Sequence, residues 1–433
     1  MPSLPLTVLP FLLGFLSFFK IEFIGSASAS EVLLVAAMPF YTNRMIKLMQ
    51  DRRIRRLLVL GVLYFVALII ADIYRLNPAE DYLRGWARVG FTLLALVSLT
   101  AILNGEKRMA WLPFLVGWYL SPLGSILVYG VQAELYKFYL GTSVSAFSLL
   151  ALGYLPAVLA PVAYALPLLA TAIAFLSDSR SLAGMTLLAF IVVVLMARRQ
   201  KLENLSTRKL ILAALIIVLS TVGIVRFYSY ATSRGYFGEV AYDKYMSQVS
   251  PGDDTLGSII YGGRIEIYFT WPKIVESPFI GYGSWPKDWV YTHGRAAELN
   301  IPSLGALLGS RSNVDAGLIP SHSHIMGAWL EAGILGAVFW TYALWLTLRL
   351  LTSGHIAKVG KLWPIFTYVL VSFAWDLFFS PYGGGRRVWN GFVLAWIISV
   401  ASELKPQPRV AKYPFGSREL APRKTLRHLP KWR

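Results

Sequence analysis

The sequence predicts an all-α polytopic membrane protein, and three observations lead to this fold class. Of the 433 residues, 56% are hydrophobic and 15% are charged, against roughly 25% charged residues in an ordinary soluble domain. Apolar runs of about 17–25 residues, each long enough for one helical crossing, recur from end to end. Basic residues gather between these runs, as they do in loops that stay in the cytoplasm. A soluble enzyme and a protein with a single anchor are therefore both excluded.

About twelve spans are expected from the lengths of the apolar runs. About nine fall in residues 1–226, at 4–19, 27–41, 57–73, 89–103, 111–129, two within 142–176, 182–196 and 210–225. The segment 142–176 contains Pro156, Pro161 and Pro167, so two spans joined by a tight turn are favoured over one span plus a re-entrant piece. Residues 227–323 form a long loop, residues 324–401 hold about three spans at 325–351, 362–379 and 388–400, and residues 402–433 form a basic tail.

The positive charges predict the orientation. The larger basic clusters follow the even-numbered spans and include the tail, which places both termini in the cytoplasm and the 227–323 loop in the periplasm. Smaller groups on the outer side are Arg75, Arg84 and Arg88 and the pair Arg386 and Arg387. The net charge of +18 is thus mainly an orientation signal that also attracts membrane lipid, and nucleic acid is excluded as a partner. With no cysteine in the chain, disulfides and thiolate metal sites are excluded as well.

The 227–323 loop is too long for a simple connection and is expected to form a partly helical lid. Its best helical stretch is 264–276, followed by a tight turn at Gly281-Tyr282-Gly283. The loop is rich in Tyr and Trp, which suit either stacking on carbohydrate or a belt at the membrane interface.

Three arginine-containing segments on the outer side are candidate anion contacts. Arg180 follows Ser177-Asp178-Ser179. It would either contact an anion or extend its side chain to the membrane interface. Arg264 follows two glycines, and guanidinium groups and helix N-termini both suit phosphate oxygens. Arg386 and Arg387 follow three glycines in a segment that an ordinary turn would also explain.

Two histidines and a carboxylate complete the candidate site. His322 and His324 lie two residues apart before an apolar run, where a neutral imidazole suits a general base for a sugar hydroxyl and equally suits a helix cap. Glu331 lies two helical turns after His324 and inside the membrane, where a carboxylate is expected to have a partner.

These segments resemble the superfamily of O-antigen ligases and bacterial O-antigen or exopolysaccharide polymerases. His322-Ser323, nine further residues, Gly333 and Gly336 are similar to its His-Asn/Ser/Gln, nine residues, Gly-x-x-Gly pattern. Gly263-Arg264 and the stretch 276–283 resemble its periplasmic-loop signature, and Ser179-Arg180 resembles its earlier arginine.

The resemblance implies a GT-C-like helical fold and a metal-independent, inverting glycosyltransferase without a cofactor. Such an enzyme acts in the bacterial inner membrane on the periplasmic face and takes glycan from undecaprenyl diphosphate. By the family pattern His322 is the catalytic base and Arg180 and Arg264 hold the diphosphate, whereas His324, Glu331, Arg386 and Arg387 have supporting roles only. No metal ligand is assigned.

The acceptor is either the glycan of another lipid-linked repeat unit, for a polymerase, or lipid A–core, for a ligase. Segments such as Asp72-Ile73-Tyr74-Arg75 look like the polymerase branch, which is favoured, and a chain-length regulator is a candidate partner. Two other classes are a lipid-linked glycan flippase or other transporter and a glycan-binding scaffold without catalysis. A transporter would show internal repeats and polar residues at the bilayer midplane, neither of which stands out in the sequence.

Overall fold

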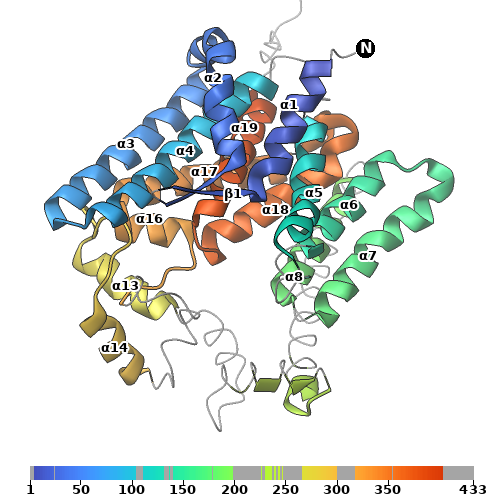
Figure 1. Cartoon of the computed structure of the whole chain (residues 1–433). Helices are drawn as coiled ribbons and strands as arrows, with labels where there is room; N and C mark the ends of the chain where they lie inside the picture. Colours follow the sequence, from blue (N-terminus) through green and yellow to red (C-terminus); the bar gives the residue numbers. More distant parts are fainter. Residues whose placement is uncertain are drawn as a thin grey trace, which may run out of the picture.

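The computed structural model describes residues 4–23, 25–103, 111–130, 140–177, 179–197, 266–299, 317–353 and 355–402, together with residues 136, 226, 230–236, 238–239, 242–243 and 246. Figure 1 shows a bundle of long helices with a small lobe at one end, made of α13 (Glu266–Glu276) and α14 (Trp289–Glu298). In the described part of the chain the only strands are β1 (Lys20–Phe23) and β2 (Gly25–Ser28), which form an antiparallel hairpin. The described part of the fold is thus helical apart from this hairpin.

Seven helical stretches in the described residues are long and apolar enough to cross a membrane. They comprise α3 (Arg52–Arg75), α4 (Ala79–Leu103), α5 (Trp111–Tyr129), α7 (Ala160–Leu176) with the short η4 (Ala157–Leu159), α8 (Arg180–Ala197), α17 (Ile334–Ser353), and α18 (Trp363–Phe379) with the end of η6 (His355–Leu362). Shorter apolar helices are α1 (Leu4–Phe15), continued by η1 (Leu16–Phe18), α6 (Gly141–Tyr154) and α19 (Arg387–Ser402). By helix length and hydropathy, the chain is a multi-pass membrane protein.

The helices agree with most of the expected spans and correct two of their boundaries. A helix lies at each expected span except 210–225, which falls outside the described residues; α2 (Ala29–Leu48) occupies the second, and α6 and α7 share the segment 142–176. Helix α4 begins at Ala79 and not near residue 89, so Arg84 and Arg88 lie on a helix and not in a loop. The expected span 325–351 consists of two helices, α16 (His324–Ala332) and α17, separated at Gly333.

Close backbone contacts and stacked rings hold the bundle together. Helices α1 and α5 cross at Gly14 and Gly117, where a Cβ on either glycine would lie 2.2 Å from a carbonyl oxygen of the other helix. Between α5 and α19, Phe114 and Phe392 stack with ring centroids 4.0 Å apart. Because lipid gives helices no hydrophobic reason to associate, such close packing is what stabilises their contacts within a membrane.

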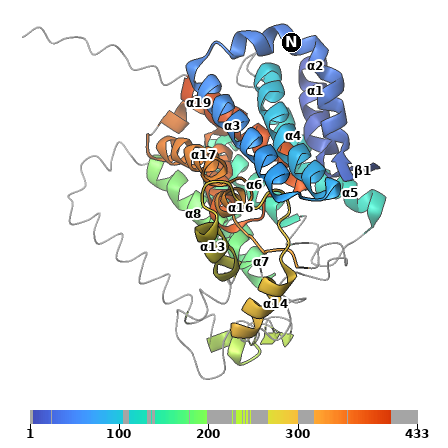
Figure 2. The same cartoon turned by 90° about the vertical axis from the view of Figure 1, so that its left-hand side faces the viewer.

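The lobe contacts the end of the bundle where α3 ends and α4 begins. Arg75 Nε donates to the carbonyl of Gly281 at 3.1 Å, and Lys287 Nζ lies 2.7 Å from the carboxylate of Asp81. Figure 1 and Figure 2 both show α13 beside α16, while α14 extends away from the bundle. This end of the bundle therefore fixes the position of the lobe.

Candidate functional site

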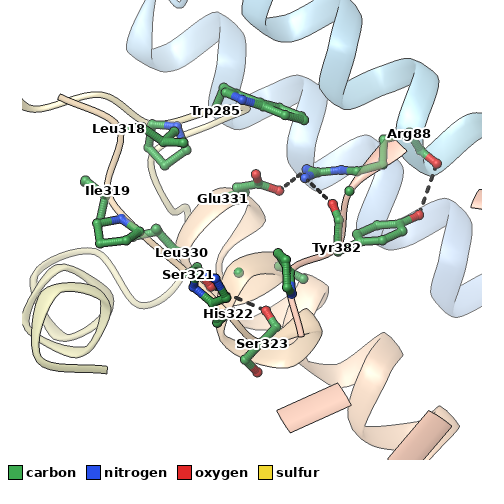
Figure 3. Close-up of a pocket in the computed structure, with 16 residues that line it drawn as sticks. Arg88, Trp285, Leu318, Ile319, Ser321, His322, Ser323, Leu330, Glu331 and Tyr382 are labelled. Atoms are coloured by element: carbon green, nitrogen blue, oxygen red, sulfur yellow. Dashed lines mark hydrogen bonds and ion pairs between the residues drawn. The ribbon is translucent and has the colours of Figure 1, made fainter. Parts of the chain in front are cut away.

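A cavity of 510 Å³ lies where α4, α16, the lobe and the segment after α18 meet. Its lining includes Arg88 from α4, Trp285 from the lobe, Glu331 from α16, Tyr382 from the segment after α18, and His322 (Figure 3). The volume falls in the range of about 300–1,000 Å³ that is usual for small-molecule sites. The cavity brings together two of the residues expected from the sequence, His322 and Glu331.

Arg88 and Glu331 form a buried ion pair in the wall of this cavity. Arg88 Nη2 donates to Glu331 Oε2, and Nη1 donates to the carbonyl of Tyr382 at 3.0 Å. The two residues are 6% and 7% exposed, and the guanidinium carbon lies 4.8 Å from the ring centroids of both Trp285 and Tyr382. Burying two charges is costly unless they are paired and hydrogen-bonded, so either residue depends on the other.

Trp285 is held in a strained backbone conformation at the edge of the cavity. Its φ of 51° lies in the left-handed region, which bulky residues rarely adopt. The preceding residue is fixed, because the amide and hydroxyl of Ser284 donate to the two carboxylate oxygens of Asp72 at 2.6 and 2.8 Å. Asp72 also accepts from the indole nitrogen of Trp86 at 2.8 Å. Strain of this kind persists where the surroundings determine the conformation, and it gathers at functional sites.

His322 lies between the cavity and the lobe. Its Nδ1 is 2.9 Å from Oε1 of Glu266, the first residue of α13, at ion-pair distance but without the angle of a hydrogen bond. The adjoining chain is also fixed to α13, because the hydroxyl of Thr270 donates to the carbonyl of Pro320 at 2.6 Å. The imidazole is 36% exposed. Helix α13 thus sets the position of His322 from one side and leaves part of the ring accessible.

The lobe docks on the broken helix through main-chain hydrogen bonds. The amides of Tyr282 and Gly283 each donate at 2.8 Å to the carbonyls of Leu330 and Glu331, which lie at the end of α16. Such carbonyls have no partner within their own helix, so the lobe caps α16. Gly333, with φ of 63°, allows this approach: a Cβ on it would lie 2.0 Å from the carbonyl oxygen of Phe279. The loop and helix glycines singled out in the sequence therefore contact each other.

A lysine joins the two helices of the lobe. Lys273 Nζ lies 3.1 Å from Glu276 Oε2 and 3.1 Å from Asp288 Oδ2. The hydrogen bond from Lys273 lowers the pKa of Glu276. Partial burial opposes ionisation of Asp288, but the backbone amide of Tyr291 and Lys273 outweigh it and lower the pKa of this carboxyl too. Both carboxylates are therefore ionised at neutral pH, where the bridge holds α13 to the start of α14.

The other expected site residues lie elsewhere. His324 is fully buried, with Nδ1 2.9 Å from the carbonyl of Ser380 and Nε2 3.1 Å from Asn390 Nδ2, so it anchors the segment that carries Tyr382. Two further predicted residues are engaged by carboxylates: Arg386 pairs with Asp376, and Arg387 pairs with Glu31 of α2.

Of the two arginines expected to bind diphosphate, the structure describes only Arg180. Arg180 is the first residue of α8, which packs against α7 and α18, and it is not among the residues that line the cavity. Arg264 lies outside the described residues, two positions before Glu266 in the sequence.

The sequence does not single out four residues of the site, Arg88, Glu266, Trp285 and Tyr382. In the sequence Arg88 is only a charge on the outer side, although an arginine next to an apolar run is a signal for a buried partner. Glu266 lies within the predicted helix 264–276 without a role of its own, Trp285 is one of many loop aromatics, and nothing in the sequence distinguishes Tyr382. Their roles depend on contacts between segments that are distant in sequence.

Fold and site together define a multi-pass helical membrane protein with a polar, aromatic cavity under a small lobe. No protein-family model matches the chain, and no curated protein matches its sequence.

Proposed function

We propose that the chain is an inner-membrane glycosyltransferase that transfers glycan from undecaprenyl diphosphate to an acceptor sugar on the periplasmic face, and that it polymerises O-antigen or exopolysaccharide repeat units. The observation that carries the proposal is the position of His322, which lines the cavity with Nδ1 2.9 Å from the carboxylate of Glu266. A carboxylate this close to an imidazole stabilises the imidazolium that forms when the histidine acts as a general base.

The arrangement of the glycines supports the proposal. The loop segment around Gly281 and the helix break at Gly333 belong to two sequence patterns that resemble the O-antigen ligase and polymerase superfamily, and they are in direct backbone contact. This contact holds the chain that leads to Trp285 against the helix that follows His322. The two sequence patterns thus lie in the helix that lines the cavity and in the loop segment that leads to Trp285.

The proposed reaction is a displacement at the anomeric carbon of the donor glycan. Nε2 of His322 takes the proton of an acceptor hydroxyl while that oxygen bonds to the anomeric carbon, and the bond from this carbon to the diphosphate oxygen breaks with inversion. Glu266 stabilises the imidazolium that forms. By the resemblance, Arg264 and Arg180 are the proposed contacts of the departing diphosphate, whose growing charge suits guanidinium groups. Arg180 does not line the cavity, so its part in the proposal rests on the sequence pattern alone.

The distribution of charge supports a periplasmic lobe. Helix α3 has 24 residues and is therefore about 36 Å long. Its basic start, from Arg52 to Arg56, is at the end of the helix away from Arg75, which contacts the lobe. Since basic clusters stay in the cytoplasm, the lobe belongs on the periplasmic side of a bundle of about twelve spans with both termini cytoplasmic.

Transport is the second candidate, and the break between α16 and α17 is the observation that favours it. Transporters use discontinuous helices and charged groups at their substrate sites. Here, however, the carbonyls at the break accept hydrogen bonds from the lobe, and Glu331 is paired with Arg88. These contacts give the break a structural role, so glycan transfer remains the better-supported function.

The test is an assay of the purified chain in lipid nanodiscs with undecaprenyl-diphosphate glycan as donor. The same lipid-linked repeat unit serves as acceptor in one arm, and lipid A–core serves in the other. We expect longer glycan in the first arm, and a loss of roughly 10²–10⁴-fold in rate for His322→Ala, the contribution of a general base. Glu266→Gln should lose part of this rate because the imidazolium that forms is then no longer stabilised by a carboxylate.

The matched control is His293→Ala, which removes a half-buried histidine of α14 whose Nδ1 lies 2.9 Å from the carbonyl of Trp289. This variant should transfer glycan at the rate of the parent chain. Equal activity of the His322 and His293 variants would contradict the proposed base, and product only with lipid A–core would make the enzyme a ligase.

A further inference from the structure

We propose that the cavity beside His322 is a subsite for a neutral pyranose ring, which stacks on Trp285 and forms hydrogen bonds with the Arg88–Glu331 pair. Within the proposed function this ring is the acceptor sugar, and in that respect the inference rests on the function above. The binding of a sugar to the cavity is itself independent of any transfer.

The charges of the cavity favour a neutral ligand over a phosphate. Among the described residues, Arg88 is the one arginine of the lining, and its charge is compensated by Glu331 through a direct ion pair. An anion entering here would meet the carboxylate as well as the guanidinium. Sugar hydroxyls both donate and accept hydrogen bonds, so they match a neighbouring carboxylate and guanidinium, and hydrogen bonds to charged groups are the stronger ones.

The aromatic residues supply the second requirement of a sugar site. Trp285 is half-buried, and its ring lies beside the guanidinium of Arg88 at 4.8 Å. An indole combines a large apolar face, on which the C–H groups of a sugar ring pack, with a polar edge. The structure holds this residue at a φ of 51°, in a backbone conformation that costs on the order of 1–3 kcal/mol. Because the fold keeps the indole ring at the cavity in spite of this conformational cost, we infer that the ring contacts a ligand there.

An unused donor gives a third indication. In the described part of the chain, Nε of Arg88 is buried and has no hydrogen-bond partner, although Nη1 and Nη2 are both engaged. Buried donors are nearly always paired, with protein, water or a ligand. Figure 3 shows Arg88 and Trp285 on one side of the cavity and His322 across from them. A ring bound to the first two would therefore have hydroxyls directed towards the imidazole.

Sugar binding can be measured without a donor, by saturation-transfer difference NMR on the full chain in nanodiscs. The probes are the methyl glycosides of glucose, galactose, mannose, rhamnose and N-acetylglucosamine. We expect saturation of at least one glycoside, with the signal about tenfold weaker in Trp285→Gly and partly kept in Trp285→Phe. Glycine suits the positive φ of this position, so the first variant removes the ring and the strain together.

Trp345→Ala is the matched control, because Trp345 is a half-exposed indole on α17 that also lies beside an arginine, with Arg349 at 5.3 Å. It should bind glycoside like the parent chain. A second variant, Arg88→Met with Glu331→Leu, removes both charges at once, so that no single buried charge is left. It should also lose the signal.

The absence of any glycoside signal that depends on Trp285 would overturn the inference, as would equal loss in the Trp345 variant. The sugar-binding experiment and the glycan-transfer assay can fail independently of each other. Glycan transfer that needs His322, without sugar binding at Trp285, would refute the subsite alone. Sugar binding at Trp285 together with full activity of His322→Ala would refute the proposed base alone.

Discussion

Replacing Gly333 with alanine tests the docking of the lobe on the broken helix. Gly333 has φ of 63° and ψ of −159°, a conformation that is essentially restricted to glycine and costs another residue about 1–3 kcal/mol. The new Cβ would also lie 2.0 Å from the carbonyl oxygen of Phe279. Overpacking of this kind costs typically about 1–3 kcal/mol. Together these effects predict that the variant is destabilised by on the order of 2–6 kcal/mol.

The assay compares thermal unfolding of the purified variant and the parent chain, with limited proteolysis to detect release of the lobe. Gly184→Ala is the control: Gly184 lies within α8, and nothing is within 4 Å of an added Cβ. Alanine there should stabilise the helix by about 0.5–1 kcal/mol. If Gly333→Ala unfolded at the same temperature as Gly184→Ala, with the lobe equally resistant to protease, the proposed role of the helix break would be refuted.

Three further predictions concern topology, the diphosphate and the buried ion pair. In this cysteine-free chain, Ser250→Cys should react with an impermeant maleimide in intact cells and Ser417→Cys should not; the opposite pattern would reverse the orientation. Arg264→Lys should lose most of the transfer activity and Arg264→Ala nearly all, because a planar guanidinium binds phosphate at two points; normal glycan from Arg264→Ala would make it a turn residue. Arg88→Met should lower the free energy of unfolding by about 3–5 kcal/mol, and adding Glu331→Leu should restore most of it; a double variant no more stable than the single one would argue against the pair.

Hydropathy predicted the helices well because each crossing needs a long apolar run, and this requirement is local. It placed the start of α4 too late, near residue 89, because Glu80, Asp81 and Arg84 make the first turns polar. Those turns contact the lobe: Asp81, for example, pairs with Lys287. A hydropathy pattern reports contact with lipid, whereas a helix can continue beyond it wherever protein or water replaces lipid.

The candidate site was predicted only in part, since its main contacts join distant segments. His322 and Glu331 stood out by their own chemistry at the start of an apolar run. The partners of these two residues did not stand out in the sequence. Arg88 is 243 residues from Glu331, and Glu266 contacts His322 from another helix. His324, which resembled His322 in the sequence, has its ring against Ser380 and Asn390. Spacing alone could not separate the accessible histidine from the buried one.

The attachment of the lobe has a consequence for how its surface can change. The hydrogen bonds to Leu330 and Glu331 come from the amides of Tyr282 and Gly283, so docking needs glycines at a few positions but sets few demands on the neighbouring side chains. Phe279 illustrates this freedom: its carbonyl lies against Gly333 while the residue as a whole is 75% exposed. Exchange of such side chains can therefore change the shape and polarity of the lobe surface while the docked backbone stays in place.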